Sequence, residues 1–156
     1  MNATGEQWSD DGAMALALDE ARRAGVAGDV PVGAVALRDG RVIAAAGNRR
    51  ESDTDPTAHA EVLVLREAAA ALGRWRLDDV TVVVTLEPCA MCAGALVHAR
   101  VKRVVLGAMD EKAGAVGSRY NLLSDPRLNH EIDVTVGVRG EESSELLQRF
   151  FADKRG

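Results

Sequence analysis

One histidine and two cysteines stand at a spacing that suits a metal centre. His59 precedes Cys89 and Cys92, which lie in the segment Pro88-Cys89-Ala90-Met91-Cys92. An imidazole nitrogen and two thiolate sulfurs can occupy three corners of a tetrahedral zinc site and leave the fourth corner for water. Structural zinc is normally closed by four protein ligands, whereas catalytic zinc keeps an open position. The spacing therefore predicts one catalytic Zn²⁺ ion per chain.

Glu61 adds a carboxylate two residues after His59, and the ligand count does not need it. Zinc lowers the pKa of bound water towards about 7, and a neighbouring carboxylate can accept the proton and pass it to a leaving amine. The chemistry that fits is hydrolytic release of ammonia from an amidine-like carbon. His-x-Glu followed by Pro-Cys-x-x-Cys is typical of zinc-dependent nucleobase deaminases.

The same residue types also occur in other sites. A Cys-x-x-Cys pair can be a dithiol redox couple, part of a closed structural zinc site, or two buried thiols. A fourth nitrogen ligand would have to be His98 or His130, because the chain has three histidines. We expect His98, on an apolar stretch, to be packed and hydrogen-bonded rather than a ligand. His130 follows a turn, where it can face nucleic acid or solvent.

A helix is expected to position the two thiols. Pro88 suits a helix start, and the apolar residues after Cys92 continue at helical spacing to about Arg100. Side chains three residues apart share one face of a helix, so both sulfurs would point the same way. Unpaired N–H groups at a helix N-terminus favour the thiolate, which is the form that binds metal.

A second helix is expected to position His59. Asp55-Pro56-Thr57 reads as a helix start, and Gly73 is a good C-terminal stop. Two helix N-termini would then converge on one ion. Each helix is expected to follow a strand, which places the site at one edge of a sheet.

The rest of the chain predicts an α/β fold. Apolar spacing over residues 13–21 indicates a first helix capped by Ser9 or Asp10, and Asp39-Gly40 between two β-rich runs indicates a hairpin. Further strands are expected at residues 80–85, 103–106 and 132–138, with a last helix over residues 142–151. Strands joined by helices favour parallel neighbours. The result is a three-layer α/β/α domain with a mixed five-stranded sheet.

Length and composition limit the other possibilities. The 156 residues fit one domain, 1–156, in which we expect residues 1–8 to be frayed. No apolar run approaches the ~20 residues of a membrane span, and two cysteines assigned to a metal fit a cytoplasmic protein. The net charge of −5 argues mildly against a nucleic-acid partner. Phosphate binding needs only a local basic patch, which these residues can supply: Arg49, Arg50, Arg100, Lys102, Arg103, Arg149, Lys154 and Arg155.

Several segments resemble one enzyme family in order and without large gaps from about Trp8 to Phe151. They are Asp29-Val30-Pro31-Val32-Gly33-Ala34-Val35, Asp55-Pro56-Thr57-Ala58-His59-Ala60-Glu61, Thr85-Leu86-Glu87-Pro88-Cys89-Ala90-Met91-Cys92-Ala93-Gly94-Ala95, Arg103-Val104-Val105-Leu106-Gly107-Ala108, Gly114-Ala115-Val116-Gly117-Ser118 and Leu128-Asn129-His130. Together they resemble the bacterial tRNA-specific adenosine deaminases, the TadA family of the cytidine-deaminase-like superfamily. The zinc motif alone is shared across that superfamily, whereas the later segments are more specific.

The resemblance implies a function and a set of site residues. Members of this family convert the wobble adenosine in the anticodon loop of an arginine tRNA to inosine, with zinc and as homodimers. The fold implied is cytidine-deaminase-like. The residues implied are the zinc ligands His59, Cys89 and Cys92, the proton shuttle Glu61, the base-binding Asn48, and the RNA contacts Asp110 and Asn129.

Two other functions fit parts of the pattern. The same scaffold can deaminate a free base or nucleoside, such as guanine or cytosine, because the size of the pocket cannot be deduced from sequence. A non-catalytic RNA-binding module stabilised by zinc would use the same three ligands. Glu61 separates that module from an enzyme, since a structural site does not need the carboxylate.

Overall fold

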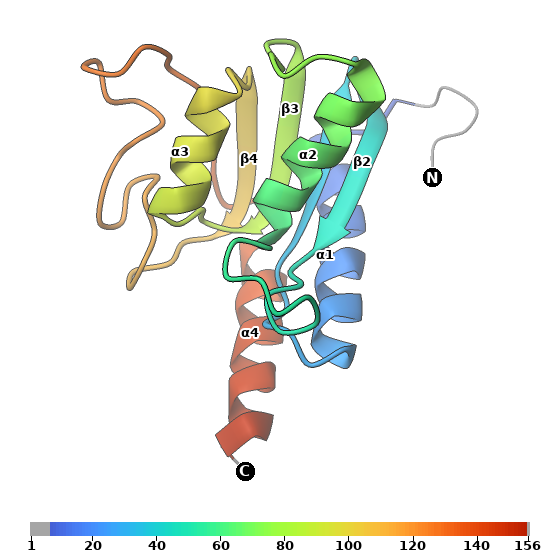
Figure 1. Cartoon of the computed structure of the whole chain (residues 1–156). Coiled ribbons are helices and arrows are strands. Elements are labelled where there is room, and N and C mark those ends of the chain that lie inside the picture. Colours follow the sequence, from blue (N-terminus) through green and yellow to red (C-terminus); the bar gives the residue numbers. More distant parts are fainter. Residues whose placement is uncertain (1–6, 156) are drawn as a thin grey trace.

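Helices and strands alternate along most of the chain (Figure 1). The computed structural model describes residues 7–155. The elements, in order, are α1 (Asp10–Val26), β1 (Gly33–Arg38), β2 (Arg41–Gly47), α2 (Ala60–Leu72), β3 (Val80–Leu86), α3 (Ala90–His98), β4 (Arg103–Ala108), β5 (Asp133–Thr135) and α4 (Gly140–Arg155).

The strands form one mixed sheet in the order β2-β1-β3-β4-β5. Strand β1 is antiparallel to both β2 and β3, whereas β3, β4 and β5 are parallel neighbours. Asp39 and Gly40 have φ of 53° and 74°, the left-handed conformation that a tight hairpin turn requires. The predicted mixed five-stranded sheet is confirmed.

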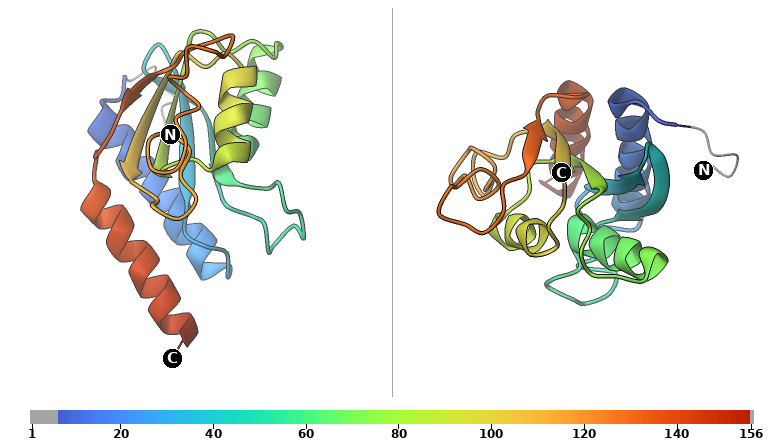
Figure 2. Two further views of the ribbon diagram at one scale, coloured as in Figure 1. Left: turned by 90° about the vertical axis from the view of Figure 1, so that its left-hand side faces the viewer. Right: turned by 90° about the horizontal axis from the view of Figure 1, so that it is seen from above.

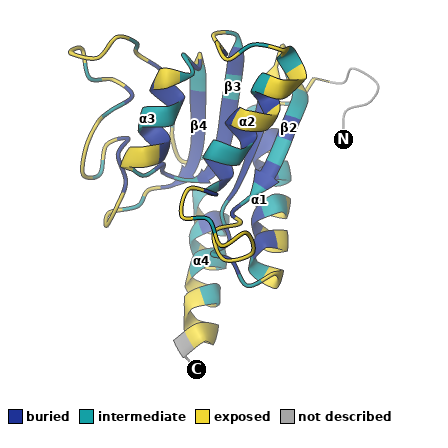
Figure 3. Ribbon diagram, in the orientation of Figure 1, coloured by how far each residue is buried: buried dark blue, intermediate teal, exposed yellow. Residues whose placement is uncertain are grey.

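Helices cover both faces of the sheet. Figure 2 shows α1 and α4 on one face and α2 and α3 on the other. The central strands are therefore buried on both sides, as Figure 3 shows. Along β3, Val82 and Val84 pack towards α2 and α3, while Val83 packs towards α1 with Met14 and Leu18. This period of two is what a strand buried on both faces requires, and the predicted three-layer α/β/α fold is confirmed.

The first helix starts where the sequence predicts, because the Ser9 side chain accepts a hydrogen bond from the N–H of Gly12 (3.1 Å). The fifth strand is shorter than the predicted 132–138. It pairs with β4 only over Asp133–Thr135. Gly137 and Arg139 have positive φ values of 82° and 54°, so the chain turns into α4 instead of extending.

The N-terminal prediction falls largely outside the described residues, since it covers positions 1–8. Within the described part, the side-chain amide of Gln7 donates to Asp39 O (3.1 Å) and the N–H of Trp8 donates to Gly40 O (2.8 Å). These two residues are thus tied to the β1–β2 turn. Among the helices of residues 7–155, none has the length and apolar character that crossing a bilayer requires.

The space around two glycines predicts opposite effects of alanine substitution on stability. Gly33 lies where α1 packs closely on β1, whereas Gly94 lies on an open face of α3. A Cβ added at Gly33 would lie 2.0 Å from Ala17 O, whereas one added at Gly94 in α3 would meet nothing within 4 Å. Gly33→Ala should lower the free energy of unfolding by at least about 2 kcal/mol, because the helix must move away from the strand. Gly94→Ala should raise it by about 0.5–1 kcal/mol. Chemical denaturation measures both, and equal stabilities would contradict this packing.

Candidate active site

The N-termini of α2 and α3 lie close together, and each helix has a candidate metal ligand as its N-cap residue. His59 is the N-cap of α2 and Cys89 the N-cap of α3, and neither side chain makes a capping hydrogen bond. Helix N-caps are usually Ser, Thr, Asp or Asn, whose oxygens satisfy free N–H groups. The imidazole and the thiol are instead turned towards each other. The predicted convergence of two helix N-termini is confirmed.

The start of α2 differs from the prediction. Asp55-Pro56-Thr57 does not open the helix, because Asp55 Oδ1 accepts hydrogen bonds from both the N–H and the hydroxyl of Thr57 (2.8 Å each). This local turn uses the capping group before the helix begins at Ala60. His59 therefore keeps an extended backbone (φ −75°, ψ 151°) that aims its ring at the cysteines. The stop at Gly73, with φ 69°, is as predicted.

His59, Cys89 and Cys92 form a cluster able to hold a metal ion. Their ligand atoms all lie within 4.8 Å of one another. His59 Nδ1 is 3.7 Å from Cys89 Sγ and 3.5 Å from Cys92 Sγ. Tetrahedral zinc, with bonds of about 2.3 Å to sulfur and about 2.0–2.1 Å to nitrogen, separates those atoms by about 3.5–3.6 Å. His59 Nδ1 thus lies close to the distance from each sulfur that a zinc ion would impose.

The protonation of the thiols also favours a cation between them. A hydrogen bond from Cys92, stronger here than the opposing burial, lowers the pKa of Cys89 to about 5. The adjacent Cys89 sulfur and burial raise the pKa of Cys92 well above its usual range. Because the two sulfurs are adjacent, only the Cys89 thiol ionises readily when no cation lies between them. A divalent cation would stabilise both thiolates, because coordination deprotonates a thiol outright.

Glu61 lies in the first turn of α2 and is 4% exposed. Burial raises the pKa of its carboxyl group from 4.5 to about 7, against smaller opposing effects of hydrogen bonding. A carboxyl group with a pKa near neutrality can both accept and return a proton at physiological pH. The structure thus gives Glu61 the property that a general acid–base group needs.

A cavity of about 180 Å³ opens beside the cluster. Its lining residues include two of the three cluster residues and come from five parts of the chain: Val30, Val32, Asn48, Arg50, His59, Ala60, Glu61, Leu86, Glu87, Cys89, Asp110 and Ala113. The structure thus brings Asn48 and Asp110 to the same cavity as Glu61. It does not bring Asn129 there, which lies on the exposed segment that precedes β5.

Asn48 is held in a fixed orientation at the cavity wall. Its Nδ2 donates to Val30 O (3.2 Å), and its Oδ1 accepts from the N–H of Arg50 (3.1 Å). Asp110 is also ordered, because its Oδ1 accepts from the N–H groups of Lys112 (3.1 Å) and Ala113 (3.2 Å). An amide has two N–H donors and two acceptor lone pairs, so Asn48 retains capacity for a ligand.

The other two histidines do not complete the cluster. His98 is exposed on α3, so the prediction that it is packed was wrong. Helix α3 is apolar on average, but its outer face is not covered within the chain. His130 Nε2 lies 2.7 Å from Val101 O, which fixes the ring against the turn between α3 and β4. Among the described residues the metal cluster consists of His59, Cys89 and Cys92.

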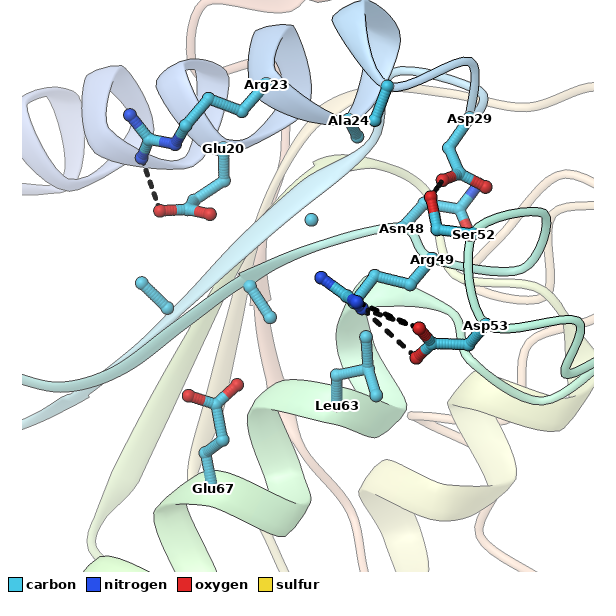
Figure 4. Close-up of a pocket in the computed structure, with 14 residues that line it drawn as sticks. Glu20, Arg23, Ala24, Asp29, Asn48, Arg49, Ser52, Asp53, Leu63 and Glu67 are labelled. Carbon is cyan, nitrogen blue, oxygen red and sulfur yellow. Dashed lines mark hydrogen bonds and ion pairs between the residues drawn. The ribbon is translucent and has the colours of Figure 1, made fainter.

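A second cavity of about 350 Å³ lies at the open edge of β2 (Figure 4). This cavity does not extend the predicted basic patch. Arg49 is paired with Asp53 (2.9 Å), and the carboxylates of Glu20 and Glu67 line the same cavity. Arg103 is likewise paired with Asp10 (2.5 Å). These two arginines are therefore neutralised by carboxylates in the structure.

Two buried carboxylates were missed as parts of the site. Asp29 is 1% exposed and accepts from the N–H of Glu51 (2.6 Å) and the hydroxyl of Ser52 (2.5 Å), which fastens the loop after Asn48. Glu87 is 2% exposed and fastens the segment after β4. Their sequence signal is a single acidic residue next to an apolar segment: Asp29 stands directly before one and Glu87 directly after one. Such a signal does not say what the carboxylate binds.

Comparison with known proteins assigns the class. The sequence model of the MafB19-like deaminase family matches residues 8–155. A guanine deaminase from Nitrosomonas europaea has a solved structure that superimposes with a TM-score of 0.79 at 26% identity, covering 94% of this chain and 87% of that one. The fold is therefore cytidine-deaminase-like, and the class of protein is that of the hydrolytic deaminases.

More similar proteins assign the family. A tRNA-specific adenosine deaminase of Bacillus subtilis (strain 168) is 49% identical over 142 residues, which cover 91% of this chain and 88% of that protein. A structure solved in studies of A-to-I editing by tRNA:A34 deaminases superimposes with a TM-score of 0.84 at 50% identity, covering 86% of this chain and 98% of that one. The chain belongs to the family of tRNA-specific adenosine deaminases, as its sequence motifs predict.

The cluster predicts one divalent metal ion per chain, lost when a thiol is replaced. Cys92→Ser should lower the affinity for metal by at least about tenfold, because a hydroxyl is a poor substitute for a thiolate. Metal analysis after dialysis against a chelator should show depletion, together with a lower melting temperature. Met91→Leu is the matched control, since Met91 is 38% exposed in the same helical turn. Full metal occupancy in Cys92→Ser would contradict the assignment.

Proposed function

We propose that this chain hydrolyses adenosine to inosine at the wobble position of a tRNA anticodon, with Zn²⁺ held by His59, Cys89 and Cys92. The observation that carries the proposal is the three-residue cluster with the buried carboxyl group of Glu61 in the same cavity. The names of the similar proteins supply the tRNA substrate. An arginine tRNA is the substrate that the family resemblance implies, and such an enzyme works in the cytoplasm as the single domain 1–156.

The reaction replaces the C6–N bond of adenine with a C6–O bond and releases ammonia. Zinc, when bound, supplies an activated water as the nucleophile. The Glu61 carboxylate would accept a proton from the attacking water and return it to the leaving amino group, a task that its pKa of about 7 suits. Asn48 holds the base through its amide. Water is limited in the cavity because apolar residues such as Val30, Val32 and Leu86 line it.

The size of the cavity supports a flipped nucleotide as the substrate. About 180 Å³ is room for one base and no duplex. Asp110 lines the cavity, and we propose that it contacts the nucleotide next to the flipped base. Asn129 lies outside the cavity on an exposed segment, where we propose that it contacts the RNA further along the loop.

We propose that the enzyme is a homodimer joined through α2 and α3. A strongly apolar groove runs between these helices on the face away from the sheet, lined by Leu65, Ala69, Trp75, Ala95 and His98 among others. Trp75 is 62% exposed there in the single chain. An apolar groove of this kind is typical of a protein interface.

Sedimentation should show a dimer that Trp75→Glu converts to a monomer, because a carboxylate would be buried without a partner. Tyr120→Glu is the matched control, since Tyr120 is also 62% exposed but lies outside the groove. A wild-type monomer at micromolar concentration would contradict the proposed interface.

The function is tested directly with two kinds of substrate. The purified protein should form inosine in an anticodon stem-loop and leave free guanine and cytosine unchanged. Glu61→Gln should keep its metal and its melting temperature but lose at least about a hundredfold in kcat, because the amide cannot accept the proton.

Ammonia release from guanine with the stem-loop untouched would overturn the substrate and favour the function named for the Nitrosomonas europaea neighbour. Unchanged activity in Glu61→Gln would instead overturn the mechanism. The two failures are therefore distinguishable.

A further inference from the structure

Glu87 is a second buried carboxylate in the cavity, and the proposed reaction does not use it. It follows the last residue of β3 and precedes Pro88 and the ligand Cys89. Its side chain is 2% exposed. A carboxylate in that position needs partners, because burying an unpaired charge is costly.

Within the described residues, the hydrogen-bond partners of the Glu87 carboxylate all lie in one segment, residues 110–118, which follows β4. Oε1 accepts from the N–H of Asp110 (2.8 Å) and the hydroxyl of Ser118 (2.5 Å). Oε2 accepts from the N–H groups of Val116 (2.9 Å) and Ser118 (3.0 Å). A carboxylate offers about four acceptor positions, so these four bonds leave none for a substrate.

The hydrogen bonds fix the ionisation of Glu87. Burial raises the pKa of the carboxyl group, but the bonds from Ser118 and from the N–H groups of Asp110, Ser118 and Val116 outweigh it. The pKa consequently lies below its usual range. The four bonds occupy the acceptor positions of the Glu87 carboxylate, so Glu87 cannot replace Glu61 as proton carrier.

The segment that Glu87 holds forms part of the cavity wall. Asp110 and Ala113 line the cavity. Ala115 N–H donates to Pro88 O (2.8 Å), and Gly114 forms a bridge with Cys89, so the segment also lies against the ligand loop. Over 110–118 the chain has only isolated bridges and turns of its own. Its shape therefore depends on these cross-links.

The packing leaves little freedom between Glu87 and the segment. A Cβ added at Gly114 would lie 2.2 Å from Glu87 Oε1 and 2.5 Å from Asp110 O. The carboxylate thus fills the space that a side chain at position 114 would need. Small residues at this point allow the segment to close around the anion.

We propose that Glu87 is a positioning residue that fixes residues 110–118 as one wall of the base cavity and so sets how tightly the RNA substrate is held. The substrate in this statement rests on the proposed function. Glu87 acts through Asp110 and Ala113 and does not touch the reacting atoms.

Glu87→Gln tests the proposal with almost no change in shape. The glutamine amide retains one acceptor oxygen, but its NH₂ group must face at least one main-chain N–H. The hydrogen bonds to one of the two carboxylate oxygens are therefore lost. The KM for the anticodon stem-loop should rise at least about tenfold, with a smaller change in kcat. Amide hydrogen exchange should accelerate at least about tenfold in residues 110–118 and stay unchanged in β3 and α2.

Two further variants complete the test. Ser118→Ala removes one of the four bonds and keeps the three main-chain donors, so it should fold and raise KM by about two- to fivefold. Glu145→Gln makes the same chemical change on the exposed surface of α4 and should leave KM, metal content and exchange unchanged.

The outcomes separate positioning from simple structural support. A variant with a lower melting temperature and lost metal, but with normal KM and normal exchange over residues 110–118 in the remaining folded protein, would overturn the proposal. So would a wild-type KM in Glu87→Gln. If the wild-type protein does not edit the stem-loop, the proposed function fails, while the exchange measurement still decides whether Glu87 holds the segment.

Discussion

Two helix N-termini meet beyond the carboxyl end of β3, and the rest of the site depends on that meeting. Where α2 and α3 begin, His59 and Cys89 stand in place of ordinary capping residues and leave the helix N–H groups without side-chain acceptors. This arrangement gives up stability that a serine or aspartate would supply. It gains one nitrogen and two sulfur ligand atoms within 4.8 Å of one another, and a surrounding potential that favours thiolates. Both helices pack on one face of the sheet in a shared hydrophobic core, which holds them at that distance.

Two buried carboxylates in one cavity have opposite properties because their surroundings differ. Glu61 is buried with few donors, and its pKa rises to about 7. Glu87 is buried among four donors, and its pKa falls. When the surroundings raise the pKa of one carboxyl group and lower that of another, the two groups can take different roles in the site. Glu61 is left able to move a proton, and Glu87 is left as a fixed charge that shapes the wall.

Much of the fold and the centre of the site could be predicted from the sequence, because their signals are local. The β-branched run of β3 and the spacing of Cys89 and Cys92 are examples. The start of α2 could not, since Asp55 caps a turn as readily as a helix. The role of Glu87 depends on partners 23 to 31 residues away. The exposure of His98 depends on what covers α3, which helical spacing does not state.

The central claim is a metal ion held by three side chains with one position left for water. X-ray absorption at the zinc edge of the purified protein tests it most directly. Zinc held by His59, Cys89 and Cys92 should show a first shell of two sulfur atoms and two nitrogen or oxygen atoms, one of which exchanges when a small anion is added. A shell in which all four positions are filled by protein sulfur or nitrogen atoms, unchanged by the anion, would contradict the account.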